Sequence, residues 1–102
     1  MSHIVQIQTQ VKDPTAIREA CRRLNLDPPE QGTFALFTRE ATGVAVRLPG
    51  WNYPVVIDVA SGELKYDNYE GEWGDPKELD RFTQAYAVEK SRIEARLMTF
   101  SA

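Results

Sequence analysis

The fold is decided by residues 43–68, which read GVAVRLPGWNYPVVIDVASGELKYDN. Apolar side chains recur at alternate positions within 43–48, 54–60 and 63–68, and this period is typical of half-buried β-strands. Between the last two segments, Ser61 and Gly62 form a short hairpin signal. The stretch therefore predicts three consecutive antiparallel strands.

Two segments before this stretch also have the strand period. Residues 3–11 place mainly branched side chains on one side and three glutamines on the other. Residues 33–39 carry apolar side chains on both faces, which suits a central strand. Residues 40–42 are predicted to form the turn into the strand at 43–48.

Capping signals predict two helices. Asp13 precedes Pro14, a pair typical of an N-cap and first helical position, and Pro28 with Pro29 is expected to stop this first helix. Asp75 and Pro76 open the second helix, whose apolar stripe consists of Leu79, Phe82, Tyr86, Ile93 and Leu97. We predict one α+β domain over residues 1–102, with an antiparallel sheet of about five strands, the order β-α-β-β-β-β-α, and two helices packed on one face.

Composition limits the classes of function. The chain has 102 residues, a hydrophobic content of 42% and a charged content of 26%, which are values of one globular domain. Its net charge of −3 argues against a protein that holds nucleic-acid backbones. Cys21 is the sole cysteine, and no apolar run could span a bilayer. We expect a soluble, cytoplasmic domain with no nucleic-acid or membrane partner.

The sequence offers little for catalysis or metal binding. His3 is the sole histidine and lies near the start of the chain, while Cys21 falls on an apolar helical stripe and is expected to be a core residue. Acidic residues at 67 and 78 have the spacing of a calcium loop, but the positions between them do not fit one. We predict no catalytic residue, metal or cofactor, so an enzyme is the disfavoured interpretation.

An acidic, aromatic segment is the strongest candidate site. Residues 58–80 contain eight acidic and two basic side chains. Aromatic side chains of this segment and of the preceding loop are typical anchors of protein interfaces. We predict that a protein partner binds through Trp51, Tyr53, Tyr66, Asn68, Tyr69 and Trp73. The alternative for the two tryptophans is structural, because they could plug the sheet and cap the last helix.

Two other sites are weighed against this one. Lys90 interrupts the apolar stripe of the last helix, so Tyr86 and Lys90 could line a pocket between the sheet and that helix and bind a small molecule or substrate. Arg18, Arg22 and Arg23 form a small basic patch, which we interpret as a solvated helix face.

Several motifs together resemble the hypothetical chloroplast reading frame 35 family, whose function is unknown. They are the Met-Ser-His start, the segments 7–11 and 51–56, Tyr66-Asp67-Asn68-Tyr69, Trp73-Gly74 and residues 84–90. The resemblance implies the same fold and supplies no catalytic residue. Relatives continue past the last helix into a further strand, whereas this chain ends at Ala102. Either the sheet lacks an edge strand here or another element replaces it, and an uncovered edge would favour a homodimer through a sheet edge.

Overall fold

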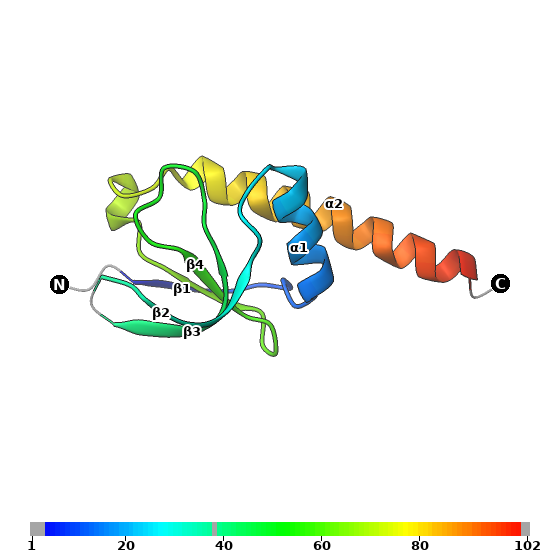
Figure 1. Cartoon of the computed structure of the whole chain (residues 1–102), viewed down its shortest axis with the longest axis horizontal. Coiled ribbons are helices and arrows are strands. Elements are labelled where there is room, and N and C mark those ends of the chain that lie inside the picture. The colour runs from blue at the N-terminus through cyan, green and yellow to red at the C-terminus, as the bar shows by residue number, and fades with distance from the viewer. Residues whose placement is uncertain (1–3, 38, 101–102) are drawn as a thin grey trace.

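A computed structural model describes residues 4–37 and 39–100, so His3 lies outside the described residues. One antiparallel sheet has the strand order β1-β5-β4-β3-β2. Two helices, α1 and α2, pack on one of its faces (Figure 1). The predicted α+β class and element order are confirmed. The elements are β1 (Val5–Gln8), α1 (Pro14–Arg23), β2 (Glu30–Ala35), β3 (Glu40–Val46), β4 (Val55–Asp58), β5 (Glu63–Tyr66), the short 3-10 helix η1 (Tyr69–Gly71) and α2 (Pro76–Phe100).

The main core lies between the helices and one face of the sheet. Leu64 of β5 pairs with Ile57 of β4, which in turn pairs with Val44 of β3, so these side chains point to the same face. They pack with Ile17 of α1 and Phe82 of α2, both at 0% exposure. The other face has a smaller cluster of Leu36, Ala41 and Val56, with Phe34 and Tyr53 packed against it.

The β2–β3 hairpin differs from the prediction. The Leu36 amide donates to the Arg39 carbonyl at 2.8 Å, and residues 40–42, predicted to be the turn, belong to β3. Strand β2 is an edge strand, not a central one. Phe34 and Leu36 of the predicted strand join the smaller cluster on the face without helices, whereas Ala35 and Phe37 are exposed. Gly43 is required here, since a Cβ would lie 2.3 Å from the Ile57 carbonyl oxygen.

Both helices begin where the capping signals predict. Asp13 accepts hydrogen bonds from the amides of Thr15 and Ala16, and Asp75 accepts one from the Lys77 amide. Helix α1 ends earlier than predicted, because Asn25 adopts a left-handed conformation with φ of 57° before the prolines are reached. Burial raises the pKa of the Cys21 thiol to about 11, in agreement with a core role.

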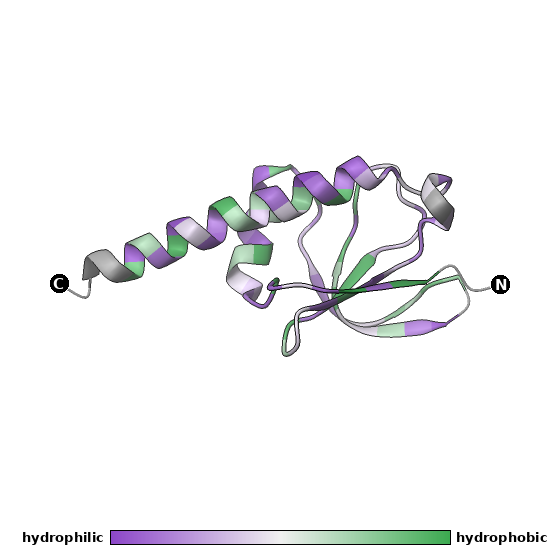
Figure 2. Ribbon diagram, turned by 180° about the vertical axis from the view of Figure 1, so that it is seen from behind, coloured by the Kyte–Doolittle hydropathy of each residue, from purple (hydrophilic) through white to green (hydrophobic). Residues whose placement is uncertain are grey.

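Helix α2 extends past the sheet (Figure 1). Apolar residues recur along it into the projecting part (Figure 2). Its stripe passes from Phe82, which is fully buried, through the partly buried Ile93 to Leu97, which is 63% exposed. Neither described helix is apolar enough over its length to cross a membrane.

Candidate functional site

The connection from β5 to α2 is a tightly hydrogen-bonded loop. Asp67 and Asn68 are buried at its start, and the Asp67 carboxylate accepts from the Tyr69 amide at 3.2 Å. The Asn68 carbonyl accepts from the amides of Gly71 and Trp73, while its side-chain amide donates to the Gly74 carbonyl at 3.3 Å. Asn68 is therefore a structural residue that fixes the positions of Tyr69 and Trp73.

Trp51 and Tyr66 lie beneath this loop on the helix side of the sheet. Their rings meet edge to face at 5.5 Å and pack against the main core. The indole N–H of Trp51 donates to the Asp75 carbonyl at 3.0 Å, and its ring covers Gly74 so closely that a Cβ there would lie 2.4 Å away. Burial, together with the charge of Asp80, raises the pKa of Tyr66. Trp51 thus ties the loop before β4 to the start of α2, as the structural alternative for this tryptophan expects.

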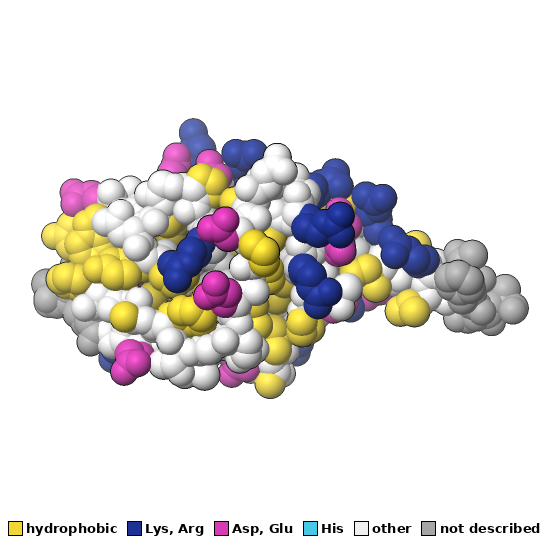
Figure 3. Space-filling model, in the orientation of Figure 1, with side chains coloured by type: hydrophobic (Ala, Val, Ile, Leu, Met, Phe, Trp, Pro, Cys, Tyr) yellow, Lys and Arg dark blue, Asp and Glu magenta, His cyan; other side chains and the backbone are white. Residues whose placement is uncertain are grey.

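Four other rings form a surface group that we call the aromatic cluster: Phe37, Tyr53, Tyr69 and Trp73. Trp73 stacks on Tyr69 with ring centres 4.6 Å apart, and it meets Phe37 and Tyr53 edge to face at 4.9 and 5.8 Å. Phe37 is 52% exposed and the other three rings are partly exposed. Figure 3 shows a hydrophobic patch at the end of the molecule where the β5–α2 loop lies.

The structure thus divides the six residues predicted to bind a partner. Tyr53, Tyr69 and Trp73 come together at the surface, whereas Trp51, Tyr66 and Asn68 support them from below. Phe37 was not predicted. A signal for it was available. Phe37 follows Leu36 in an extended segment, so the two side chains point to opposite faces, and only one of them is buried.

The loop that carries Tyr69 and Trp73 is acidic. Residues 67–75 contain four acidic side chains and no basic one, and Glu72 and Asp75 are exposed. Rings with an apolar face beside exposed carboxylates can bind a cationic side chain through both cation–π and charge attraction.

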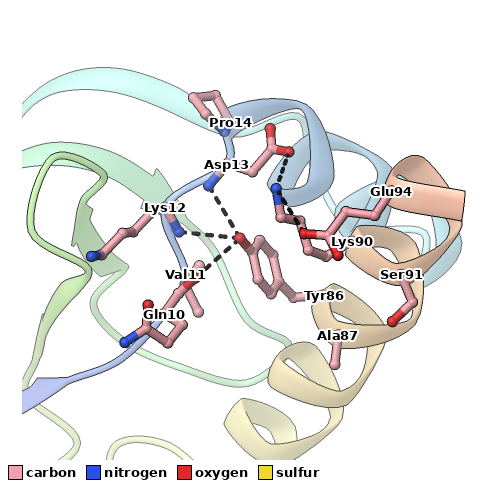
Figure 4. A pocket seen from close by; sticks show the side chains of 10 residues that line it. All are labelled: Gln10, Val11, Lys12, Asp13, Pro14, Tyr86, Ala87, Lys90, Ser91 and Glu94. Carbon is pink, nitrogen blue, oxygen red and sulfur yellow. Dashed lines mark hydrogen bonds and ion pairs between the residues drawn. The ribbon is translucent and has the colours of Figure 1, made fainter. Parts of the chain in front are cut away.

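Tyr86 and Lys90 line a separate groove of about 730 Å³ between residues 10–14 and α2 (Figure 4). The Tyr86 hydroxyl accepts from the amides of Lys12 and Asp13, each at 3.1 Å, and donates to the Gln10 carbonyl at 3.3 Å. Its hydrogen-bonding capacity is fully used. The tyrosine of this groove therefore holds residues 10–13 on α2.

Lys90 is paired in the same groove. Its ammonium lies 3.1 Å from the Asp13 carboxylate and 3.6 Å from that of Glu94, and its side chain is 37% exposed. The hydrogen bond to Asp13 raises the pKa of Lys90, with a further contribution from the charge of Glu94. A lysine held in its charged form is a poor nucleophile or base, since both roles need the neutral amine.

Metal-binding groups are not assembled in the described part of the chain, where no three His, Cys, Asp or Glu side chains lie together in a way that could hold an ion. Comparison of the chain with models of protein families, with curated proteins and with solved structures found no match. The resemblance to the chloroplast reading frame family therefore stays a prediction.

Proposed function

We propose that this protein is a non-enzymatic interaction module whose aromatic cluster and adjoining acidic loop bind a protein partner. The observation that carries the proposal is the position of Trp73, which contacts rings from three separate segments while all four rings stay partly exposed. Trp51 is also partly exposed, but it packs against the main core and on Gly74 and donates to the Asp75 carbonyl, as a structural plug would.

The cluster is suited to binding because its rings are already ordered. Trp73 is held by a backbone bond from the Asn52 amide to its carbonyl at 2.9 Å, and its own amide donates to Asn68. Tyr69 stacks on it. Aromatic anchors that keep their positions before binding lose little conformational entropy when a partner arrives.

The chemistry of the surface favours a partner that presents a basic segment. The exposed carboxylates of Glu72 and Asp75 attract lysine and arginine, and the exposed ring faces can contact the same cations. We place the interaction in the cytoplasm, consistent with a single cysteine that is buried as a free thiol. A homodimer through β1 or β2, the two sheet edges, is retained as a second mode of assembly.

The alternative of a ligand-binding or enzymatic pocket receives less support. Tyr86 and Lys90 are both engaged in internal contacts, and the groove between them is open at the surface. A binding or catalytic role would have to break contacts that hold residues 10–13 on α2.

Site-specific photocrosslinking tests the proposal. A benzophenone amino acid replaces Phe37 in one variant and Val88, which is 43% exposed on α2, in a matched control. In extracts of the source cells, the probe at position 37 should give a discrete crosslinked partner that the probe at 88 does not. Raising the salt concentration should weaken the product, because the proposed partner is basic.

Two further outcomes decide the interpretation. Adding Tyr69→Ala to the position 37 variant should reduce the crosslink while circular dichroism and the unfolding midpoint show that the chain stays folded. Identical products from positions 37 and 88, or no product from position 37, would exclude the aromatic cluster as the binding surface.

A further inference from the structure

A second surface lies between α1 and α2, away from the aromatic cluster (Figure 1). It is a groove of about 390 Å³, and Figure 3 shows basic side chains gathered over these two helices. We call it the arginine groove, after its four arginines: Arg22, Arg23, Arg92 and Arg96. Glu19 and Glu89 also line it, so its six charged side chains sum to +2 in a chain whose net charge is −3.

A shared carboxylate organises the groove. Glu89, only 12% exposed, lies 3.2 Å from Arg23 of α1 and 3.7 Å from Arg92 of α2. It holds a guanidinium from each helix at the groove and links the helices there. Arg23 and Arg92 share this one carboxylate, so the three side chains together keep a net positive charge.

Few of the guanidinium donors of the groove have a partner among the described residues. Each guanidinium has five N–H donors. Arg22 meets Glu19 at 3.5 Å, and Arg96 has no ion-pair partner among the described residues. Four arginines with so few contacts form a site for carboxylates or phosphates, which guanidinium groups bind in a bidentate manner.

The apolar residues of the groove indicate which anion fits. Ile93 of the groove lies between Arg92 and Arg96 and is partly buried against the main core, and Leu97, outside the groove lining, continues the stripe of α2 at 63% exposure. A nucleic-acid backbone would leave these side chains unused, and the net charge of −3 opposes a long polyanion. An amphipathic helix with acidic residues on one side would use both features.

We propose that the arginine groove binds an acidic, amphipathic helical segment of a partner protein. Arg92 and Arg96 are four residues apart on α2, so their backbones are separated by about 6 Å along the helix axis. Glutamates four residues apart on a partner helix have the same spacing, which allows both to pair at once while leucines of that helix cover Ile93 and Leu97. The aromatic cluster takes no part in this interaction, so either proposal can fail without the other.

A binding experiment with defined probes tests this inference. The probe is a fluorescently labelled peptide of alanine, leucine and glutamate, with leucines on one helical face and glutamates four residues apart beside them. A peptide with lysine in place of every glutamate is the charge control, and a single-stranded DNA oligonucleotide is the nucleic-acid control. Fluorescence anisotropy measures affinity, and amide chemical shifts of the labelled protein locate the bound peptide.

The test variant is Arg92→Gln with Arg96→Gln, and the matched control is Arg18→Gln with Arg81→Gln. The control removes the same charge from exposed positions of α1 and α2 that do not line the groove. The glutamate peptide should bind the wild type and shift amides of α1 and α2. Its affinity should fall by about tenfold or more in the groove variant, because two charge-assisted contacts are lost, and by less than about twofold in the control.

Arg96→Gln alone guards against a folding defect, because this change leaves Glu89 and its two partners intact, and it should still weaken the peptide several-fold. Equal losses in the groove and control variants would mean non-specific attraction and would overturn the proposal. So would failure of the wild type to bind the glutamate peptide, or tighter binding of the DNA that is lost in the groove variant.

Discussion

Replacing Tyr86 with phenylalanine tests how the N-terminal segment is held on α2. The hydroxyl contacts three backbone groups of residues 10–13, more than 70 positions away in the sequence. The ring itself is 6% exposed and belongs to the main core, and phenylalanine keeps that packing. The substitution therefore removes the hydrogen bonds without opening a cavity.

The expected cost follows from the amides that lose their partner. Two N–H donors, those of Lys12 and Asp13, lose the acceptor at 3.1 Å. At about 1 kcal/mol for each of the two amides that lose their acceptor, the free energy of unfolding should fall by about 2 kcal/mol. A larger loss is not expected, because the adjoining groove admits water to these amides. With an unfolding entropy of about 2.1 cal/mol/K per residue, the 102-residue chain should melt roughly 9 °C lower.

Urea denaturation at neutral pH, followed by circular dichroism, measures the change, and an unaltered slope would show that the unfolded state is the same. Tyr53→Phe is the matched control, because the Tyr53 hydroxyl has no hydrogen-bond partner among the described residues; its effect should stay within about 0.5 kcal/mol. A loss below about 0.5 kcal/mol for Tyr86→Phe would refute the reasoning, since water would then replace the hydroxyl at no cost.

Two further substitutions and one thiol-labelling reaction test the packing at Gly74, the cap at Asp13 and the burial of Cys21. Gly74→Ala should cost about 2 to 3 kcal/mol and alter the fluorescence of Trp51, because its Cβ would lie 2.4 Å from the indole ring; an unchanged urea midpoint would show that the ring moves freely. Asp13→Ala should cost about 1 kcal/mol at neutral pH through loss of the cap. Burial of the Asp13 carboxylate opposes its ionisation, but hydrogen bonds from Lys90 and two amides lower its pKa overall from 3.8. The contribution of Asp13 to the free energy of unfolding is therefore complete above pH 3.8 and is lost as the pH falls through the lowered pKa. Urea titrations across acidic pH should show the two proteins converge, and a constant difference would contradict this. Cys21 should react with a thiol reagent at pH 8 about a hundredfold or more slowly in the folded chain than in urea, because burial raises its pKa from 9.0 to about 11; rapid stoichiometric labelling of the folded chain would contradict its core position.

The helices and the central strands were predictable because their signals are local. Asp13 and Asp75 cap their helices through bonds to amides two or three residues away, so the sequence alone carries the information. Ser61-Gly62 works in the same way, since Gly62 has φ of 82° within the β4–β5 turn.

The β2–β3 register was not predictable from alternation alone. Both strands contain apolar or small residues at consecutive positions, and a period of two then fits more than one register. The structure pairs Gly32 with Gly43 and Thr33 with Thr42, whose hydroxyls lie 2.8 Å apart. Gly43 has to face the Ile57 carbonyl, and this contact with β4 comes from tertiary structure.

The candidate site was predictable in composition but not in arrangement. The sequence indicates that aromatic residues gather near the acidic loop, yet it does not show that Trp51 packs against the main core whereas Trp73 packs on the rings of Phe37, Tyr53 and Tyr69. Phe37 joins the cluster from a hairpin about 36 residues away in sequence from Trp73, a contact that only the folded sheet brings about.

Helix α2 determines the positions of both proposed surfaces. Its first residues are fixed by the Trp51–Asp75 bond, its middle by Tyr86, and its outer half carries Arg92 and Arg96. Asp75 and Arg92 are 17 residues apart, which is roughly 25 Å along a helix. At this distance, substitutions at the two surfaces share no contacts and should act additively. The acidic loop beside the aromatic cluster and the arginine groove differ in the sign of their charge, so the two proposals call for different partners.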